Sequence, residues 1–142
     1  MASVYFPLVP SMDLPADRTA PSRARNFVAE TMRTWELPRS TIADAVLLVS
    51  ELVTNALLHA RSAPSVEVTR SQGRVRCVVS DDSPLAPRRR RYAADAATGR
   101  GIALVETLAS RWGTEPDGTG KRVWFELDVN GALDDESENV NA

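Results

Sequence analysis

The sequence predicts an α+β domain, a two-layer α/β sandwich with helices on one face of a mixed, mostly antiparallel sheet. Two consecutive segments between residues 21 and 60 carry apolar residues at helical spacing. Two segments that alternate in period two, 65–70 and 74–80, flank a short turn with a glycine, which indicates a β-hairpin. A further helix and a second strand pair follow, and this order favours the sandwich.

Composition indicates one globular domain. The 142 residues are 43% hydrophobic and 25% charged, close to the average for soluble proteins. The apolar runs are too short for a membrane span, and no basic region precedes an apolar block at the N-terminus, so we expect neither a transmembrane helix nor a signal peptide. The single cysteine, Cys77, excludes an internal disulfide and a multi-cysteine zinc site. Together these features predict a cytoplasmic protein.

The N-terminal half begins with an expected strand and continues with two helices. The strand covers 3–9 and is of edge type because Pro7 has no N–H to donate; a loop follows over 13–20. The first helix starts at Pro21 and runs to about Trp35, where Leu37-Pro38 ends it. Its expected apolar face consists of Ala24, Phe27, Val28, Thr31 and Trp35.

The second helix is expected to run to about Ala60. Ser40 or Thr41 is a suitable N-cap, and Asp44 would lie in the first turn, where the helix dipole favours an acid.

The C-terminal half is expected to be mostly strand. Val66 and Val68 should share one face of the first hairpin strand, with Val75, Cys77 and Val79 on one face of the second. The other expected elements are a loop over 82–98, a helix over 101–110, a strand over 111–114, a turn over 117–120 and a strand over 122–129.

We expect three regions along the chain. Residues 1–17 form a strand and loop that belong to the same domain as 18–129, and 130–142 form an acidic disordered tail.

The second helix carries the most informative polar residues. It is apolar around nearly its whole circumference, yet Glu51, Asn55 and His59 recur every four residues and so share one face. A buried carboxylate is costly unless it is paired, binds a metal or faces a polar cavity. An exposed stripe, or a solvated Glu beside a structural Asn, is an equally good interpretation. His59 fits a capping or packing role better than a ligand role.

Two later segments suit polar ligands, although each is weak alone. Asp81 ends an apolar strand, a common place to hold a ligand and also an ordinary place for a turn. Gly99 and Gly101, on either side of Arg100, precede an apolar helix whose free N–H groups suit a phosphate.

The order of these segments resembles the GHKL (Bergerat-fold) ATP-binding superfamily: an acid-and-amide helix, a strand ending in Asp, then Gly-x-Gly before a helix. Within it the chain is similar to the small anti-sigma-factor serine kinases of Gram-positive bacteria, including their actinobacterial relatives. The likeness covers about 18–129, and its most specific part is the N-box-like stretch 49–60.

The resemblance implies ATP and Mg²⁺ as cofactors and a role for each matching residue. Asn55 would be the Mg²⁺ ligand, Glu51 the general base for a substrate hydroxyl, and Asp81 the acceptor for the adenine amino group. Arg25 would lie near the phosphoryl-transfer site. The phosphates would be contacted by Gly99, Gly101 and Arg100, with 83–98 as a lid over the nucleotide.

The chain departs from the family pattern at three places. Ser83 and Leu85 replace both glycines of the Asp-x-Gly-x-Gly box, and this favours weaker nucleotide binding or a less mobile lid. Ser83 stays a candidate cofactor contact. Lys121 stands where a threonine hydroxyl is usual, so an ammonium would replace its phosphate contact. Arg88 to Arg91 fall in the lid, either as a solvated loop or as a phosphate clamp or partner surface.

The leading hypothesis is an ATP-binding anti-sigma factor that phosphorylates an antagonist protein on serine or threonine. The main alternative is a nucleotide-binding partner switch of the same fold without catalysis. A histidine-kinase-like catalytic domain is disfavoured because 142 residues leave no room for a dimerisation helix pair. Binding of nucleic acid through Arg88 to Arg91 is disfavoured because no aromatics interleave the basic run. The implied partners are a sigma factor, the antagonist and a second copy in a homodimer.

Overall fold

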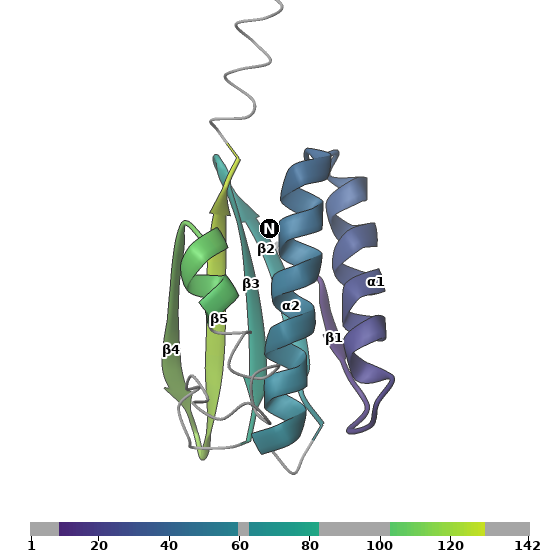
Figure 1. Cartoon of the computed structure of the whole chain (residues 1–142), viewed down its shortest axis with the longest axis vertical. Coiled ribbons are helices and arrows are strands. Elements are labelled where there is room, and N and C mark those ends of the chain that lie inside the picture. Colours follow the sequence, from purple (N-terminus) through teal and green to yellow (C-terminus); the bar gives the residue numbers. More distant parts are fainter. Residues whose placement is uncertain (1–8, 60–62, 83–102, 130–142) are drawn as a thin grey trace, which may run out of the picture.

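The computed structural model describes residues 9–59, 63–82 and 103–129. Their element order is that of the expected sandwich (Figure 1): β1 (Ser11–Asp13), α1 (Ala20–Thr34), α2 (Arg39–His59), β2 (Ser65–Ser71), β3 (Arg74–Asp81), a short helix over 103–108, β4 (Arg111–Asp117) and β5 (Gly120–Asp128).

The five described strands form one sheet in the order β1-β2-β3-β5-β4. All four pairings are antiparallel. β5 therefore lies between β3 and β4, and β4 and β5 pair as a hairpin at the edge of the described sheet. The α+β prediction is confirmed, and the described part of the sheet is antiparallel throughout.

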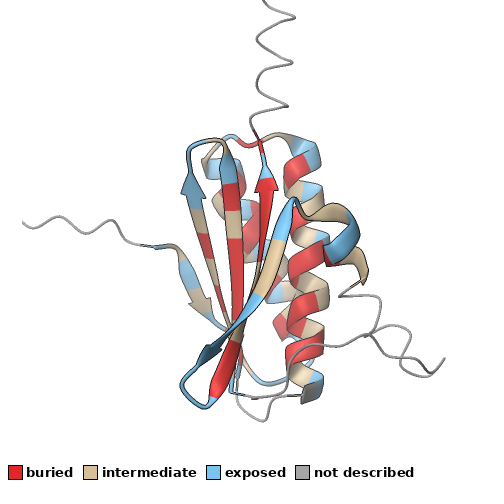
Figure 2. Cartoon of the chain, turned by 90° about the vertical axis from the view of Figure 1, so that its left-hand side faces the viewer, coloured by how far each residue is buried: buried red, intermediate tan, exposed pale blue. Residues whose placement is uncertain are grey.

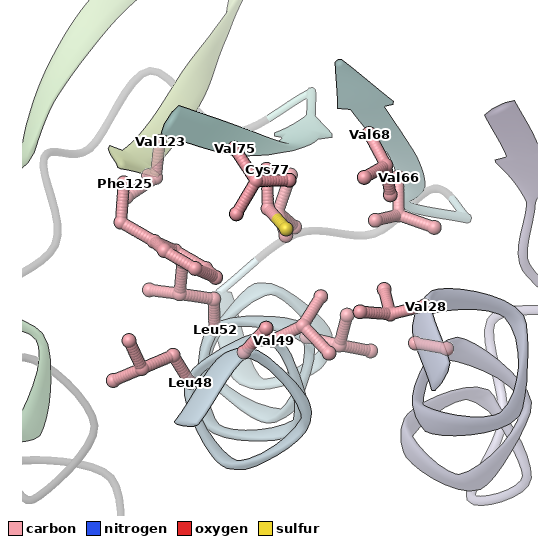
Figure 3. Close-up of a cluster of buried hydrophobic side chains, with 14 of the residues drawn as sticks. Val28, Leu48, Val49, Leu52, Val66, Val68, Val75, Cys77, Val123 and Phe125 are labelled. Atoms are coloured by element: carbon pink, nitrogen blue, oxygen red, sulfur yellow. The ribbon is translucent and has the colours of Figure 1, made fainter. Parts of the chain in front are cut away.

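Helices α1 and α2 lie side by side on one face of the sheet, and helix 103–108 lies on the same face (Figures 1 and 2). The core fills the space between these layers, where side chains of α2 meet those of β3 and β5 (Figure 3). The predicted inward faces of the first hairpin are confirmed, since Val66, Val68, Val75, Cys77 and Val79 are all buried. Burial also raises the pKa of the Cys77 thiol far above its usual value.

Helix α1 follows the prediction closely, with Pro21 in its first turn. Its fully buried stripe is Ala20, Ala24, Val28 and Met32. Thr31, expected on the apolar face, instead donates its hydroxyl to the Phe27 carbonyl. The helix ends as predicted before Pro38: Glu36 takes a left-handed conformation with φ 56°, and the Leu37 N–H donates to the Met32 carbonyl.

Helix α2 begins earlier than predicted. The Pro38 carbonyl accepts the Ile42 N–H, so the helix starts at Arg39 and leaves Ser40 and Thr41 inside it. The N-cap prediction is wrong for this reason, and Asp44 lies beyond the first turn. Among the described helices, α2 alone is long and apolar enough for a membrane span by length and composition, yet it is the core helix of the sandwich, packed against α1 and the sheet.

The strands differ from the prediction at both ends of the sheet. The expected strand 3–9 falls almost entirely outside the described residues, and the observed N-terminal strand, Ser11–Asp13, pairs with β2. β4 extends to Asp117, beyond the predicted end at Thr114, because it pairs with β5 as far as the turn. Helix 103–108 ends before Ala109, two residues earlier than expected.

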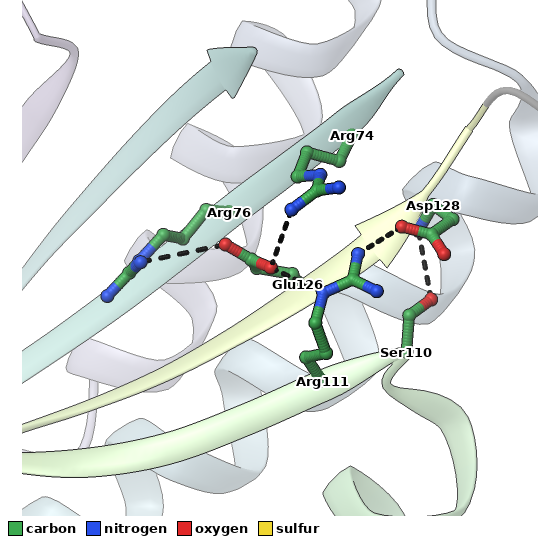
Figure 4. Close-up of polar contacts among 6 residues, drawn as sticks. All are labelled: Arg74, Arg76, Ser110, Arg111, Glu126 and Asp128. Carbon is green, nitrogen blue, oxygen red and sulfur yellow. Dashed lines mark hydrogen bonds and ion pairs between the residues drawn. The ribbon is translucent and has the colours of Figure 1, made fainter. Parts of the chain in front are cut away.

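The face of the sheet away from the helices carries a network of ion pairs (Figure 4). Glu126, whose side chain is 11% exposed, lies near the guanidinium groups of Arg74, Arg76 and Arg111. Arg111 also pairs with Asp128. Arg76 stacks over the Trp124 ring, 4.3 Å from its centroid. These contacts tie β3, β4 and β5 together on the face that the described helices leave uncovered.

Gly120 lies very close to the backbone at the end of β3. A Cβ atom on Gly120 would lie 2.0 Å from the Asp81 carbonyl oxygen and 2.7 Å from the Asp82 Cα atom. Because both atoms belong to the backbone, no rotamer change would relieve the contact. Gly120 therefore sets how β5 begins beside the end of β3.

We predict that Gly120→Ala destabilises the protein by about 1–3 kcal/mol, since the overpacked strands must move apart. Thermal or urea unfolding measures the change. Gly118→Asn is the matched control in the same turn. Its φ is +62°, a conformation that Asn tolerates, and no atom lies within 4 Å of its Cβ position. Wild-type stability in Gly120→Ala would contradict the close approach.

Candidate functional site

Two polar residues of α2, Glu51 and Asn55, lie on the flank that faces β5. Leu48 and Leu52 point from α2 toward Phe125 (Figure 3). Asn55 follows Leu48 by seven residues, which returns it to nearly the same side of the helix. Glu51 precedes Asn55 by one turn and is half-buried. The predicted stripe of Glu51 and Asn55 therefore stands beside the sheet; the side chain of His59 lies outside the described residues.

Asn55 differs from a polar residue that only packs in the core, because its buried side-chain oxygen has no hydrogen-bond donor among the described groups. The residue is 7% exposed. Its carboxamide oxygen Oδ1 is buried and accepts no hydrogen bond from any described group. An unpaired buried acceptor costs about 1–3 kcal/mol, so it calls for a ligand or other donor.

This oxygen fits the magnesium that the fold family implies. Mg²⁺ prefers oxygen ligands and is usually held by one or two protein groups, with phosphates and water in the other positions. The described residues contain no cluster of three or more His, Cys, Asp or Glu side chains suited to a metal. A single amide oxygen is therefore consistent with a metal that arrives bound to phosphates.

Asn55 lies at the same height along the domain as the end of β3 and the start of β5. α2 leads into β2 and runs opposite to β5, with nearly parallel axes (Figure 1). From the level where Leu48 faces Phe125, Asn55 lies about 10 Å toward the C-terminal end of the helix. Lys121 lies about 13 Å in the same direction along β5. The end of α2, the end of β3 and the start of β5 thus meet at one end of the domain.

Asp81 and Lys121 form an ion pair at this end. They are direct partners in the antiparallel register of β3 and β5. The Lys121 ammonium lies 3.0 Å from each carboxylate oxygen of Asp81. Their side chains are only 2% and 7% exposed, respectively. Asp81 therefore stands where the sequence analysis expected it, at a buried strand end, and the Lys121 ammonium lies against its carboxylate.

A hollow of about 570 Å³ runs along the β4–β5 hairpin beside this pair. Lys121 lines it together with Thr114, Glu115, Pro116 and the turn residues Gly118 to Gly120. Thr114 and Pro116 lie opposite Val123 and Lys121 in the register, which places them on the helix-facing side of the sheet. The Lys121 side chain is thus almost fully buried, while the residue forms part of the wall of the hollow.

Arg25, which belongs to α1, contacts a different side of α2 from the one that carries Asn55. Its guanidinium Nη1 donates to the Ser50 hydroxyl over 2.8 Å. Arg25 also lines a groove between α1 and α2. Ser50 is about 140° around the helix from Asn55 and about 100° from Glu51. Arg25 therefore contacts Ser50, the residue before Glu51 in the chain, on a different side of α2 from Asn55.

Several predicted site residues lie outside the described part of the chain. These are Ser83, Gly99, Arg100 and Gly101, together with the expected lid and its Arg88 to Arg91 run.

Two features of the site were not predicted from the sequence. These are the pairing of Lys121 with Asp81 and the close backbone approach at Gly120. The antiparallel register, which places Asp81 opposite Lys121, would have indicated the pair had β3 been placed beside β5.

Comparison with solved structures shows the same fold in other proteins. The crystal structure of the RsbU and RsbW domains of Rv1364c from Mycobacterium tuberculosis matches with a TM-score of 0.66 and 23% identity, over 87% of this chain and 32% of that one. In the SiaB–SiaC complex from Pseudomonas aeruginosa the match has a TM-score of 0.57 and 12% identity, over 82% of this chain and 88% of that one. This chain therefore spans about a third of the mycobacterial protein.

The comparison with curated proteins gave no match. The family model for the histidine kinase-like ATPase domain matches residues 14–127, which include α2, β3 and β5. Since this match spans most of the sequence, the chain belongs to the histidine kinase-like ATPase family, the GHKL group that its N-box-like helix predicted.

Proposed function

We propose that the protein is an ATP-dependent serine/threonine kinase of the anti-sigma type, which sequesters a sigma factor and phosphorylates an antagonist protein. The observation that supports this most is the buried Oδ1 atom of Asn55, which accepts no hydrogen bond from a described group. Membership of a histidine kinase-like ATPase family supports nucleotide binding at this place. The proposed partners, a sigma factor and an antagonist protein, follow from the resemblance to anti-sigma kinases.

In the proposed complex, Asn55 holds Mg²⁺ through Oδ1, and Asp81 accepts the adenine amino group. The metal, when bound, neutralises charge on the phosphates. Glu51, one turn from Asn55 on the same flank of α2, would act on a hydroxyl beside the terminal phosphate. Gly99, Arg100 and Gly101 contact the phosphates, as the family resemblance implies, with Ser83 in the lid. The family resemblance also puts Arg25 near the transferred phosphoryl group, and its contact with Ser50 lies next to Glu51 in the chain.

Glu51 acts as the general base. Its carboxylate takes the proton from the substrate hydroxyl as that oxygen forms a bond to the γ-phosphorus. The bond from the γ-phosphorus to the bridging oxygen breaks, and ADP leaves with the electron pair of that bond. The products are the phosphorylated antagonist, ADP and protonated Glu51.

A second function, a nucleotide-dependent partner switch without catalysis, is favoured by one specific observation. Ser83 and Leu85 occupy both glycine positions of the family's first glycine box. ATP binding without transfer to any protein substrate would favour this function. In either case we expect a cytoplasmic protein that binds other proteins, forms homodimers and does not bind nucleic acid directly. The SiaB–SiaC structure offers an example of a protein of this fold in a complex with another protein.

We predict that Glu51→Gln lowers phosphoryl transfer at least 100-fold, because an amide cannot take the proton. ATP binding should change less than about twofold, since the amide keeps the volume of the acid. Radiolabelled ATP, Mg²⁺ and the small proteins encoded beside the gene form the assay. Glu30→Gln, an exposed change on α1, is the control. Undiminished transfer in Glu51→Gln would exclude the base role, and no transfer by the wild type would leave only the partner switch.

Asn55→Leu should stabilise the nucleotide-free protein by about 1 kcal/mol, a rise of several degrees in Tm, because it removes a buried unpaired acceptor. The same change should remove Mg²⁺-dependent ATP binding. Calorimetric unfolding of the free protein measures the first effect. Asn26→Leu, at an exposed position on α1, should alter stability by less than about 0.5 kcal/mol. A clear loss of stability in Asn55→Leu would show that Oδ1 has a structural partner.

A further inference from the structure

The Asp81–Lys121 pair presents an acceptor and a donor side by side. The ammonium is 3.0 Å from both carboxylate oxygens, and both side chains are almost fully buried. Lys121 also lines the hollow along the β4–β5 hairpin. Asp81 lines a second hollow of about 210 Å³, and Thr119 and Gly120 line both hollows. A ligand that reached into both would meet a carboxylate and an ammonium at neighbouring positions.

We propose that Lys121 reads the base of the nucleotide, donating a hydrogen bond to ring atom N1 of adenine beside the amino contact of Asp81. This inference rests on the proposed function, in which Asp81 binds the adenine amino group. It assigns Lys121 to the base instead of to the phosphates. Lys121 then determines nucleotide specificity.

The valence of the two groups allows such a contact. An ammonium has three N–H donors, and Asp81 accounts for at most two of them. A carboxylate accepts about four hydrogen bonds, so the ammonium alone does not exhaust the acceptor capacity of Asp81. Base binding thus adds to the ion pair without breaking it.

The pair matches one edge of adenine and opposes the same edge of guanine. Adenine offers an amino donor at position 6 and an acceptor at N1, which suit Asp81 and Lys121. Guanine offers a carbonyl acceptor at position 6 and an N–H donor at N1. In the same pose guanine would set acceptor against acceptor and donor against donor, and buried polar groups left unpaired are strongly rejected.

The backbone holds the two groups in this arrangement. Asp81 and Lys121 are opposite residues of neighbouring strands and so share the helix-facing side of the sheet. The close approach of Gly120 to the Asp81 carbonyl fixes the start of β5 directly beside this position. The donor and acceptor are therefore preorganised before a nucleotide binds.

The experiment titrates the wild-type chain calorimetrically with the Mg²⁺ complexes of ATP, 1-deaza-ATP, 7-deaza-ATP and GTP. Replacing N1 by C–H removes the acceptor for Lys121, so we expect 1-deaza-ATP to bind at least tenfold more weakly than ATP. 7-Deaza-ATP, which keeps the N1 edge, should bind like ATP. GTP should bind at least 100-fold more weakly.

Equal affinity for ATP and 1-deaza-ATP would overturn the role of Lys121 and leave the proposed function intact. Absence of any ATP binding would overturn both. An equal loss with both deaza analogues would also overturn it, since the effect would then not be specific to N1.

A substitution of Lys121 tests whether this residue makes the hydrogen bond to N1. Lys121→Met should bind ATP and 1-deaza-ATP with equal affinity, since the donor is gone. Arg122→Met is the matched control: it is the next residue of β5, it faces the other side of the sheet, and it pairs with Glu67. This control should keep the wild-type preference for ATP over 1-deaza-ATP. A preserved preference in Lys121→Met would overturn the assignment, and the wild-type titrations decide it even if this variant fails to fold.

Discussion

The buried carboxamide of Asn55 is the constraint on which this account of the site depends. The core helix α2 places an acceptor oxygen in the protein interior, where no described group donates to it. Such an oxygen lowers stability, and a leucine at the same position would not. The cost is understandable if the oxygen is kept for a cation that arrives with its own phosphate and water ligands. The same cation site would explain why a carboxylate, that of Glu51, lies one turn away on the same flank of α2.

The opposite wall of the site is built by the sheet. Antiparallel pairing of β3 with β5 sets Asp81 against Lys121, and Gly120 lets the two backbones approach closely. A buried carboxylate alone would be expensive, and the ammonium offsets that cost. The ion-pair network around Glu126, on the other face of the same strands, adds further contacts between them (Figure 4). A rigid sheet end therefore faces the polar flank of α2.

The sequence predicted those features that depend on local periodicity. The faces of β2 and β3, the extent of α1 and the stripe of Glu51 and Asn55 all follow from residue spacing, and the structure confirms them. The errors came where tertiary contacts decide the outcome. The start of α2 is a local exception: it was misplaced because the first helical hydrogen bond runs from the Ile42 N–H to the Pro38 carbonyl, so the helix begins before the expected caps. The pairing of Lys121 depends on which strand lies beside β3, and a single sequence does not reveal this. The roles of Glu51, Asp81 and Arg25 stay predictions.

The most direct test of the magnesium role is the affinity for ATP with and without the metal. Calorimetric titrations in Mg²⁺ and in EDTA would be compared for the wild type and Asn55→Ala. The account predicts that Mg²⁺ tightens ATP binding by the wild type at least tenfold, and that Asn55→Ala keeps the metal-free affinity but loses this gain. An equal gain from Mg²⁺ in both proteins would contradict the claim that the buried amide oxygen of Asn55 holds the ion.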